Sequence, residues 1–183
     1  MRKIVALSTS ATIPAMATEE RDWLDAFVAL LQAQAFVVDG VGADLVARRD
    51  MPLSWHEVLV RLQRSEGGAM RMQELAHSVL LSKSGLTRLA DRMEHARLIE
   101  RAGCATDRRG TFAVITPKGR RALRAASPVF LRSVQDHFAR HLSAEEVRVL
   151  NSALRKLVGP SGQASAEDCE PGDAEGASTS RAS

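Results

Sequence analysis

Apolar residues recur at helical intervals over most of this chain, so the sequence predicts a mainly helical protein. The longest such pattern runs from residue 19 to residue 48. Gly40 and Gly42 weaken this pattern, and Pro52 ends it. One long helix is therefore expected before residue 50.

Three shorter helices are predicted next. Ser54 and Glu57 have the spacing of a capping box, which predicts that a helix starts at Ser54, and Gly67 and Gly68 close it. Two amphipathic segments follow, separated by the sequence LSKS. Their apolar faces consist of Met72, Leu75, Ala76 and Val79 in the first and of Leu86, Leu89 and Met93 in the second.

The pattern then changes from helix to strand. Residues 98–101 and 111–115 are short runs typical of strands, and they flank the polar stretch GCATDRRG, which has glycine at both ends. This arrangement predicts a two-stranded hairpin with an arginine-bearing tip.

Two further helices are expected after the hairpin. Thr116 followed by Pro117 predicts an N-cap and the first helical position of one helix. Ser143 and Glu146 form a second capping-box pair, which predicts the start of a final helix.

Two short helices followed by a hairpin are the elements of a winged helix-turn-helix. The predicted fold class is therefore mainly α with a small β-hairpin wing, together with a helical dimerisation region. The predicted segments are a flexible leader (1–18), an N-terminal dimerisation helix (19–50), a winged helix-turn-helix DNA-binding domain (51–116), C-terminal dimerisation helices (117–157) and a disordered acidic tail (158–183).

Composition excludes several classes of protein. Hydrophobic residues make up 45% of the 183 residues, so full-length disorder is excluded. Two cysteines exclude a disulfide scaffold and a multi-thiolate zinc module. No apolar run approaches the roughly 20 residues of a membrane span, so we expect no transmembrane helix. No phosphate loop or nucleophile elbow stands out, and we expect neither an enzyme nor a cofactor.

Charge is distributed unevenly along the chain. The net charge is +3, but residues 71–121 hold eleven basic and five acidic residues, whereas residues 158–183 hold one basic and five acidic residues. Such a basic block favours a polyanionic partner such as double-stranded DNA. A solvated arginine-rich surface is the alternative.

The second helix of the helix-turn-helix and the tip of the wing supply the candidate DNA-binding residues. An α-helix fits the major groove, where hydroxyl and guanidinium groups suit phosphates and base edges. Arginine also suits a narrow minor groove. The helix candidates are Ser82, Lys83, Ser84, Thr87, Arg88 and Arg92, and the wing candidates are Arg108 and Arg109.

The order of these elements resembles the MarR family of dimeric bacterial transcription regulators. The family-like stretches are LSWHEVLVRL, MQELAHSVLLSKSGLTRLADRMEHARLIER, DRRGTFAVITPKG and LSAEEVRVL. The resemblance implies that Thr87 and Arg88 enter the major groove and that Arg109 enters the minor groove. It also implies that Asp107 braces the wing through a basic partner, for which Arg101 is the matching candidate.

One residue departs from the family pattern. Relatives usually have glycine where this chain has Arg97, just after the recognition helix. A left-handed backbone at this position would cost arginine about 1–2 kcal/mol. We therefore expect the helix to end differently, which leaves the angle of the wing open but not the fold.

Long apolar helices at both ends of the chain, together with the resemblance, predict a homodimer. A two-fold dimer would place two recognition helices about 34 Å apart on a pseudo-palindromic site. A purely intramolecular core is the alternative. Many relatives bind a small aromatic or phenolic effector, for which Trp23, Trp55 and His56 are candidates. Core packing is the alternative role of the two tryptophans.

Two further sensing hypotheses depend on few residues. His137 and His141 are four residues apart and could share a metal ion, but the sequence offers no obvious further ligands and favours no metal site. Cys104 lies beside the arginines of the wing, which would lower its pKa and favour oxidation. A redox-responsive regulator is thus one alternative, and an inert thiol is the other.

The sequence therefore predicts a cytoplasmic, ligand-responsive repressor that binds a pseudo-palindromic operator as a homodimer. The alternatives are a protein that coats DNA without a defined operator and an interaction module that kept the fold but lost DNA binding. At the N-terminus, an export signal ending at Ala17, a disordered leader and a translation start at Met16 remain open.

Overall fold

The computed structural model describes residues 18–79, 83–103 and 111–158, which form mainly helices. The α-helices are α1 (Thr18–Arg49), α2 (Leu53–Arg64), α3 (Met72–Ser78), α4 (Lys83–His95), α5 (Pro117–His137) and α6 (Ala144–Val158). The strands are β1 (Ala69–Arg71), β2 (Ile99–Gly103) and β3 (Thr111–Ile115). Short 3-10 segments, η1 (Glu66–Gly68) and η2 (Ala139–His141), follow α2 and α5.

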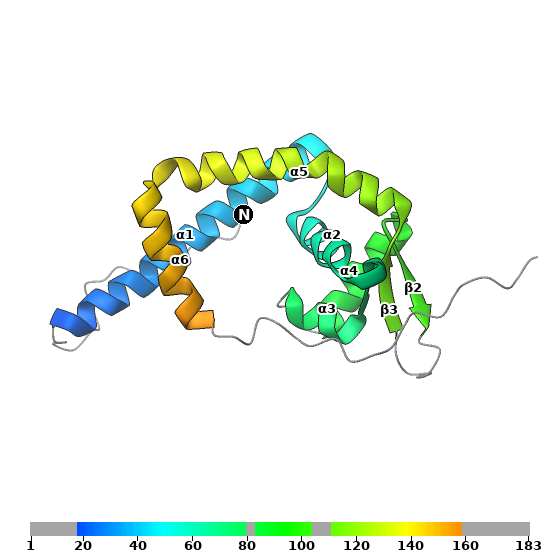
Figure 1. Ribbon diagram of the computed structural model, residues 1–183, viewed down its shortest axis with the longest axis horizontal. Coiled ribbons are helices and arrows are strands. Elements are labelled where there is room, and N and C mark those ends of the chain that lie inside the picture. The colour runs from blue at the N-terminus through cyan, green and yellow to red at the C-terminus, as the bar shows by residue number, and fades with distance from the viewer. Residues whose placement is uncertain (1–17, 80–82, 104–110, 159–183) are drawn as a thin grey trace, which may run out of the picture.

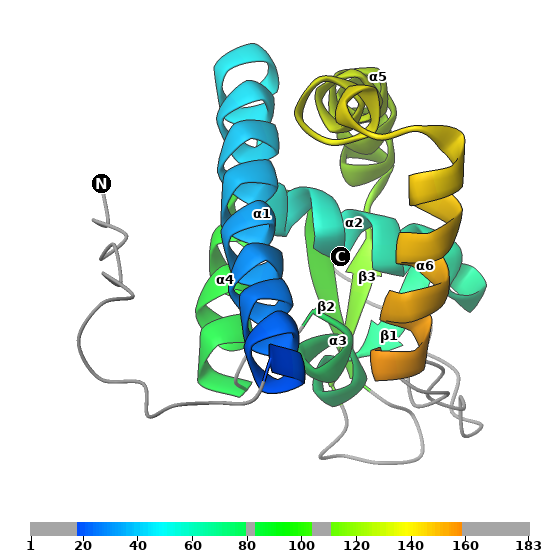
Figure 2. The same cartoon turned by 90° about the vertical axis from the view of Figure 1, so that its left-hand side faces the viewer.

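Helix α5 connects two parts of the molecule. It runs along one edge of the structure, and α2, α3, α4 and the sheet lie beneath its first half (Figure 1). The first half of α1 and the whole of α6 lie towards the other end, where both extend away from α5 (Figure 2). The fold thus has a winged helix-turn-helix at one end and extended helices at the other.

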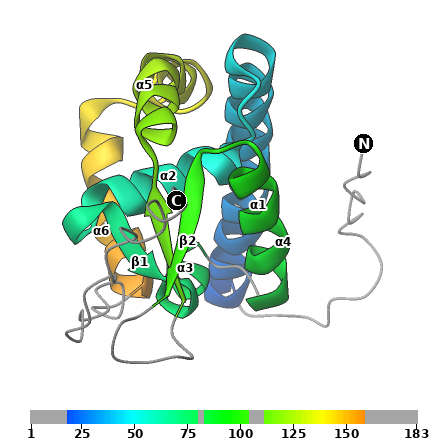
Figure 3. The same cartoon turned by 90° about the vertical axis from the view of Figure 1, so that its right-hand side faces the viewer.

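The wing belongs to a three-stranded antiparallel sheet with strand order β1-β3-β2 (Figure 3). Strand β3 pairs with β2, with Arg101 opposite Ala113, and on its other edge β3 pairs with β1, with Met70 opposite the same Ala113. The prediction of a two-stranded hairpin was therefore incomplete. Strand β1 has three residues, which are too few for an alternating pattern to be recognised.

The core joins the helix-turn-helix to α1 and α5. The predicted apolar face of α4 is confirmed, because Leu86, Leu89 and Met93 are at most 3% exposed. The other core residues include Val41 and Leu45 of α1, Leu59 and Leu62 of α2, Leu75 of α3, Ile99 and Ile115 of the sheet, and Leu123 and Ala126 of α5. Burial of this apolar surface holds α4 and the sheet against the helices above them.

The sequence Thr-Pro-Lys-Gly starts α5 as predicted. The Oγ1 atom of Thr116 accepts a hydrogen bond from the Gly119 backbone N–H at 3.0 Å, and Pro117 takes the first helical position. Gly119 is required here because a Cβ atom would collide with the Leu98 carbonyl oxygen. The motif therefore packs the start of α5 closely against the start of β2.

Of the two predicted capping boxes, one is confirmed and one is wrong. The Ser143 N–H donates to Glu146 Oε2 at 2.7 Å, and the Glu146 N–H donates to Ser143 Oγ at 3.3 Å. Ser54 and Glu57 form no such box, because the N-cap of α2 is Pro52, two residues before Ser54, and no side chain caps the helix start. Ser54 already lies inside the first turn, so its hydroxyl cannot cap the helix start.

Arg97 keeps a left-handed backbone, with φ of 59°. Its N–H donates to the Glu94 carbonyl at 2.8 Å, and the Leu98 N–H donates to the Met93 carbonyl at 2.9 Å, which is a Schellman helix end. The prediction that α4 ends differently is therefore wrong. The Thr116 hydroxyl donates to the Arg97 carbonyl at 2.8 Å, and this contact helps to hold the turn despite its conformational cost.

Helix α1 is long, apolar and mostly exposed. The stretch Arg21–Arg49 contains an 18-residue window with a mean hydropathy of 1.5, of which 6% is buried. By length and composition alone this helix could cross a membrane, which the lack of an unbroken apolar run did not indicate. Glutamines break up its apolar runs, but residues 26–38 carry no charge. Exposed apolar surface of this kind also marks contacts between protein chains.

Candidate nucleic-acid interface

Helix α4 has one buried face and one exposed face. Opposite its apolar side chains, Ser84, Thr87, Arg88 and Arg92 are exposed. Ser82 and the side chain of Lys83 lie outside the described residues. An exposed polar helix face that is held by a packed core has the shape and chemistry to enter a major groove.

Strands β2 and β3 lead to the tip of the wing. The ends of β2 and β3 that adjoin this tip point away from α5 (Figure 1). Residues 104–110, which connect the strands, lie outside the part of the chain that the structure describes. The roles of Arg108 and Arg109 in DNA binding, of Asp107 in bracing the wing and of Cys104 in redox sensing therefore stay predictions.

Arg101 in β2 contacts α4 directly. Its Nη2 donates to Asp91 Oδ1 at 2.6 Å and to the Thr87 carbonyl at 3.4 Å, and its Nη1 donates to Glu94 Oε2 at 3.0 Å. Sequence reasoning assigned Arg101 to Asp107 and missed the two carboxylates of the recognition helix. The sequence did carry a signal for these partners. Asp91 and Glu94 are three residues apart, and residues three or four apart share one face of a helix.

A polar cluster holds α1 against α5. Asp44 Oδ2 accepts a hydrogen bond from Ser133 Oγ at 2.6 Å and lies 3.2 Å from His137 Nε2. The hydrogen bond from Ser133, and then that from His137, lowers the pKa of Asp44 because both favour the ionised carboxylate. Gly40 leaves room for the imidazole, since a Cβ atom there would lie 2.6 Å from His137 Nδ1. Sequence reasoning had treated Gly40 only as a weak point in the helix.

Both histidines of the predicted pair have protein partners. His137 contacts Asp44, and His141 Nε2 lies 3.2 Å from the Asp136 carbonyl oxygen. Within residues 18–79, 83–103 and 111–158, no three or more His, Cys, Asp or Glu side chains are grouped so as to hold a metal ion. These contacts point to structural roles for the pair.

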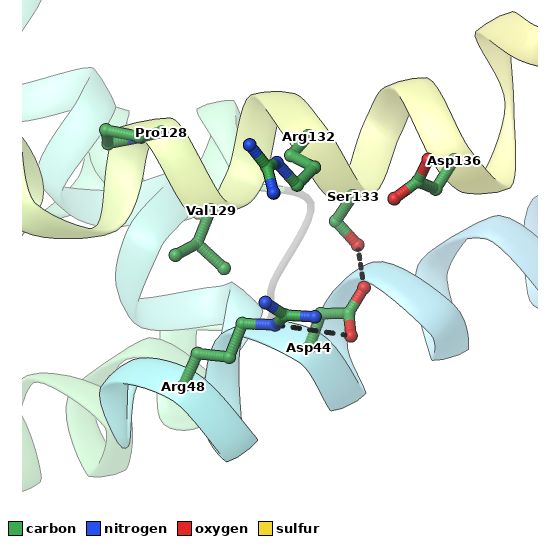
Figure 4. Close-up of a pocket in the computed structure, with 7 residues that line it drawn as sticks. All are labelled: Asp44, Arg48, Pro128, Val129, Arg132, Ser133 and Asp136. Atoms are coloured by element: carbon green, nitrogen blue, oxygen red, sulfur yellow. Dashed lines mark hydrogen bonds and ion pairs between the residues drawn. The ribbon is translucent and has the colours of Figure 1, made fainter.

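A cavity of about 170 Å³ lies between α1 and α5 (Figure 4). Arg48 of α1 and Arg132 of α5 line it from the two helices, and Pro128 and Val129 form its apolar part. The remaining lining residues are Asp44, Ser133 and Asp136. Most of the lining side chains are therefore charged or polar.

The predicted effector residues do not come together within one chain. Trp23 is 60% exposed in the first turns of α1, whereas Trp55 and His56 lie in α2, which follows the other end of that helix in the chain. Trp55 packs against the core. His56 is 4% exposed and stacks on Phe130 at 4.3 Å between ring centroids. Burial lowers the pKa of His56 and so favours the neutral imidazole.

Comparison with known proteins decides the family. A family model described as MarR family matches residues 49–110. The crystal structure of AbsC, a MarR family transcriptional regulator from Streptomyces coelicolor, shares 33% sequence identity and a TM-score of 0.70 with this chain, covering 80% of this chain and 96% of AbsC. This chain belongs to the MarR family. The family consists of transcription regulators rather than enzymes, and the predicted mainly α fold with a small β wing is confirmed.

Other MarR family proteins are also similar to this chain. A second MarR family regulator from Streptomyces coelicolor, solved in complex with DNA, is 26% identical with a TM-score of 0.71, covering 81% of this chain and 91% of that one. The regulator MhqR from Bacillus subtilis (strain 168) is 32% identical over 90 residues, which make up 49% of this chain and 61% of MhqR. The chain thus spans under two thirds of the length of this curated relative.

Proposed function

We propose that this MarR family protein is a sequence-specific DNA-binding regulator whose α4 enters the major groove. The observation that carries the proposal is the exposed polar face of α4, with Thr87 and Arg88 opposite a fully packed apolar face. The related Streptomyces coelicolor regulator solved with DNA supports it. Arg108 and Arg109 at the wing would add contacts in the adjacent minor groove.

Selection of bound sequences from a pool of random DNA tests this proposal. We expect enrichment of one pseudo-palindromic sequence and a footprint of matching length. A protein that coats DNA would instead bind every duplex with a steep dependence on salt and enrich no sequence. If the protein retards no DNA at low salt, both functions are contradicted and an interaction module is favoured.

We also propose that the protein acts as a homodimer. Large apolar side chains are exposed on the helices that extend from the DNA-binding domain. They include Trp23, Phe27, Leu31 and Phe36 of α1, Leu131 of α5, and Val149 and Leu157 of α6. A second copy related by two-fold symmetry would cover these side chains and remove their apolar surface from water.

The proposed dimer is a cytoplasmic repressor that a small aromatic or phenolic effector releases from DNA. The cavity between α1 and α5 supports this step, because a ligand there would contact both helices that adjoin the DNA-binding domain. Release requires that the effector binds the state that cannot bind DNA more tightly than it binds the state that can. Titration of benzoate and phenol into the complex of protein and operator DNA tests the step. If these compounds release DNA from the Arg132→Ala variant as well as from the wild type, the effector site lies elsewhere.

A further inference from the structure

The guanidinium group of Arg101 lies beside two turns of α4. Its contacts with Thr87, Asp91 and Glu94 fall at positions i, i+4 and i+7 of that helix, a span of about 10 Å at 1.5 Å per residue. The side chain of Arg101 is 29% exposed, and those of Asp91 and Glu94 are 54% and 40% exposed. A half-buried cation therefore links the strand that leads to the wing with two partly exposed carboxylates.

The two carboxylates lie on the helix that carries the proposed DNA contacts. Asp91 follows Thr87 and Arg88 by about one turn, so it lies near the face that would approach DNA. An ionised carboxylate close to a phosphate raises the free energy of the complex, because water and salt screen charges less inside an interface than in solution. Asp91 and Glu94 therefore weaken DNA binding unless another group neutralises them.

We infer that Arg101 is a positioning residue for DNA recognition, an inference that rests on the proposed function. Its guanidinium group pairs with both Asp91 and Glu94 and offsets one of their two negative charges. This pairing lowers the repulsion between α4 and the phosphates that Thr87 and Arg88 would approach, and it does not require Arg101 to contact DNA. A lysine would bring the same charge on a single nitrogen, whereas the two Nη atoms of the guanidinium reach Asp91 and Glu94 separately.

Variants of the full-length protein separate neutralisation from other roles. Arg101→Met keeps an apolar side chain and removes the charge, and we expect a loss of operator affinity of about tenfold or more in gel retardation. Asp91→Asn with Glu94→Gln removes the two negative charges that pair with Arg101, and this variant is expected to bind at least as tightly as the wild type. All three substitutions together are expected to restore affinity to within about threefold of the wild type.

Two results would overturn the inference. A triple variant as weak as Arg101→Met would mean that Arg101 contacts DNA or acts only through folding, and wild-type affinity in Arg101→Met would remove its role altogether. Thermal unfolding gives the second readout, because a purely structural role lowers the Tm of the single and triple variants alike. If Arg101→Met does not fold, Arg101→Lys replaces it, with affinity expected to fall and to recover when Glu94→Gln removes one carboxylate.

The wild-type protein separates failure of this inference from failure of the proposed function. If the wild type retards no DNA, the proposed function fails. If the wild type binds a selected operator but the triple variant is not rescued, only the role of Arg101 fails.

Discussion

At the end of α4, Arg97 has a left-handed backbone, which costs a residue with a Cβ atom about 1–2 kcal/mol. Glycine avoids this cost but loses more backbone entropy on folding, roughly 0.5–1 kcal/mol. We expect Arg97→Gly to raise the free energy of unfolding by about 0.5–1 kcal/mol in urea denaturation at fixed protein concentration. Arg97→Ala is the control and should bring no gain, because alanine keeps the left-handed cost. An equal gain in both variants would assign the effect to the arginine side chain.

Also at the residue scale, Arg88 should contribute to sequence recognition. We expect Arg88→Ala to weaken operator binding by about 1–3 kcal/mol and to affect random DNA less, because a lost base contact removes discrimination. Affinities on both DNAs at one salt concentration provide the measurement. Arg140→Ala removes the same charge from the exposed segment η2 and serves as control. Equal losses on operator and random DNA would assign Arg88 to a phosphate contact.

At the scale of elements, the contact between α1 and α5 depends on an ionised carboxylate. The pKa of Asp44 lies below its ordinary value of 3.8, chiefly because Ser133 and then His137 hydrogen-bond to the carboxylate. A pKa that folding lowers gives stability that is present above pH 3.8 and is lost as the pH falls through the folded value. We therefore expect Asp44→Asn to lower the free energy of unfolding at pH 7 and to differ less from the wild type at pH 3.

Urea denaturation at pH 7, 5 and 3 measures this difference. Asp39→Asn changes an exposed aspartate of the same helix and is expected to leave the free energy of unfolding unchanged. A destabilisation by Asp44→Asn that stays constant from pH 7 to pH 3 would show that the cluster depends on shape rather than on charge.

At the scale of the whole molecule, exposed apolar side chains support the proposed homodimer. Leu31 of α1 is 51% exposed and lies one turn from Phe27, which is 53% exposed. We expect Leu31→Glu to shift the proposed homodimer to monomers in sedimentation experiments, because an unpaired carboxylate in an apolar interface is costly. Operator affinity should fall as well, because two half-sites would no longer be bound by one assembly.

A matched charge change provides the control for this experiment. Gln73→Glu adds the same charge on an exposed position of α3 and should leave the dimer intact. A wild-type protein that sediments as a monomer at micromolar concentration would contradict the proposed homodimer.

The candidate interface could be predicted only in part. The two faces of α4 follow from the period of Leu86, Leu89 and Met93, and the structure confirms them. The partners of Arg101 could not be predicted, because the sequence does not show which of the chain's many carboxylates the fold brings close to β2. Pairing with Asp91 depends on the angle between α4 and β2, which the turn at Arg97 sets.

The sequence by itself determined the order of the helices, the amphipathic faces of α3 and α4, the hairpin and the family resemblance. Periodicity and capping depend on residues within a few positions of one another, so they can be recognised locally. Only the tertiary structure decided which distant residues meet. Ser133 and His137 lie 89 and 93 positions after Asp44, and the three-residue strand β1 pairs with β3 across α3 and α4. Such contacts depend on how the elements pack, and packing leaves no local pattern in the chain.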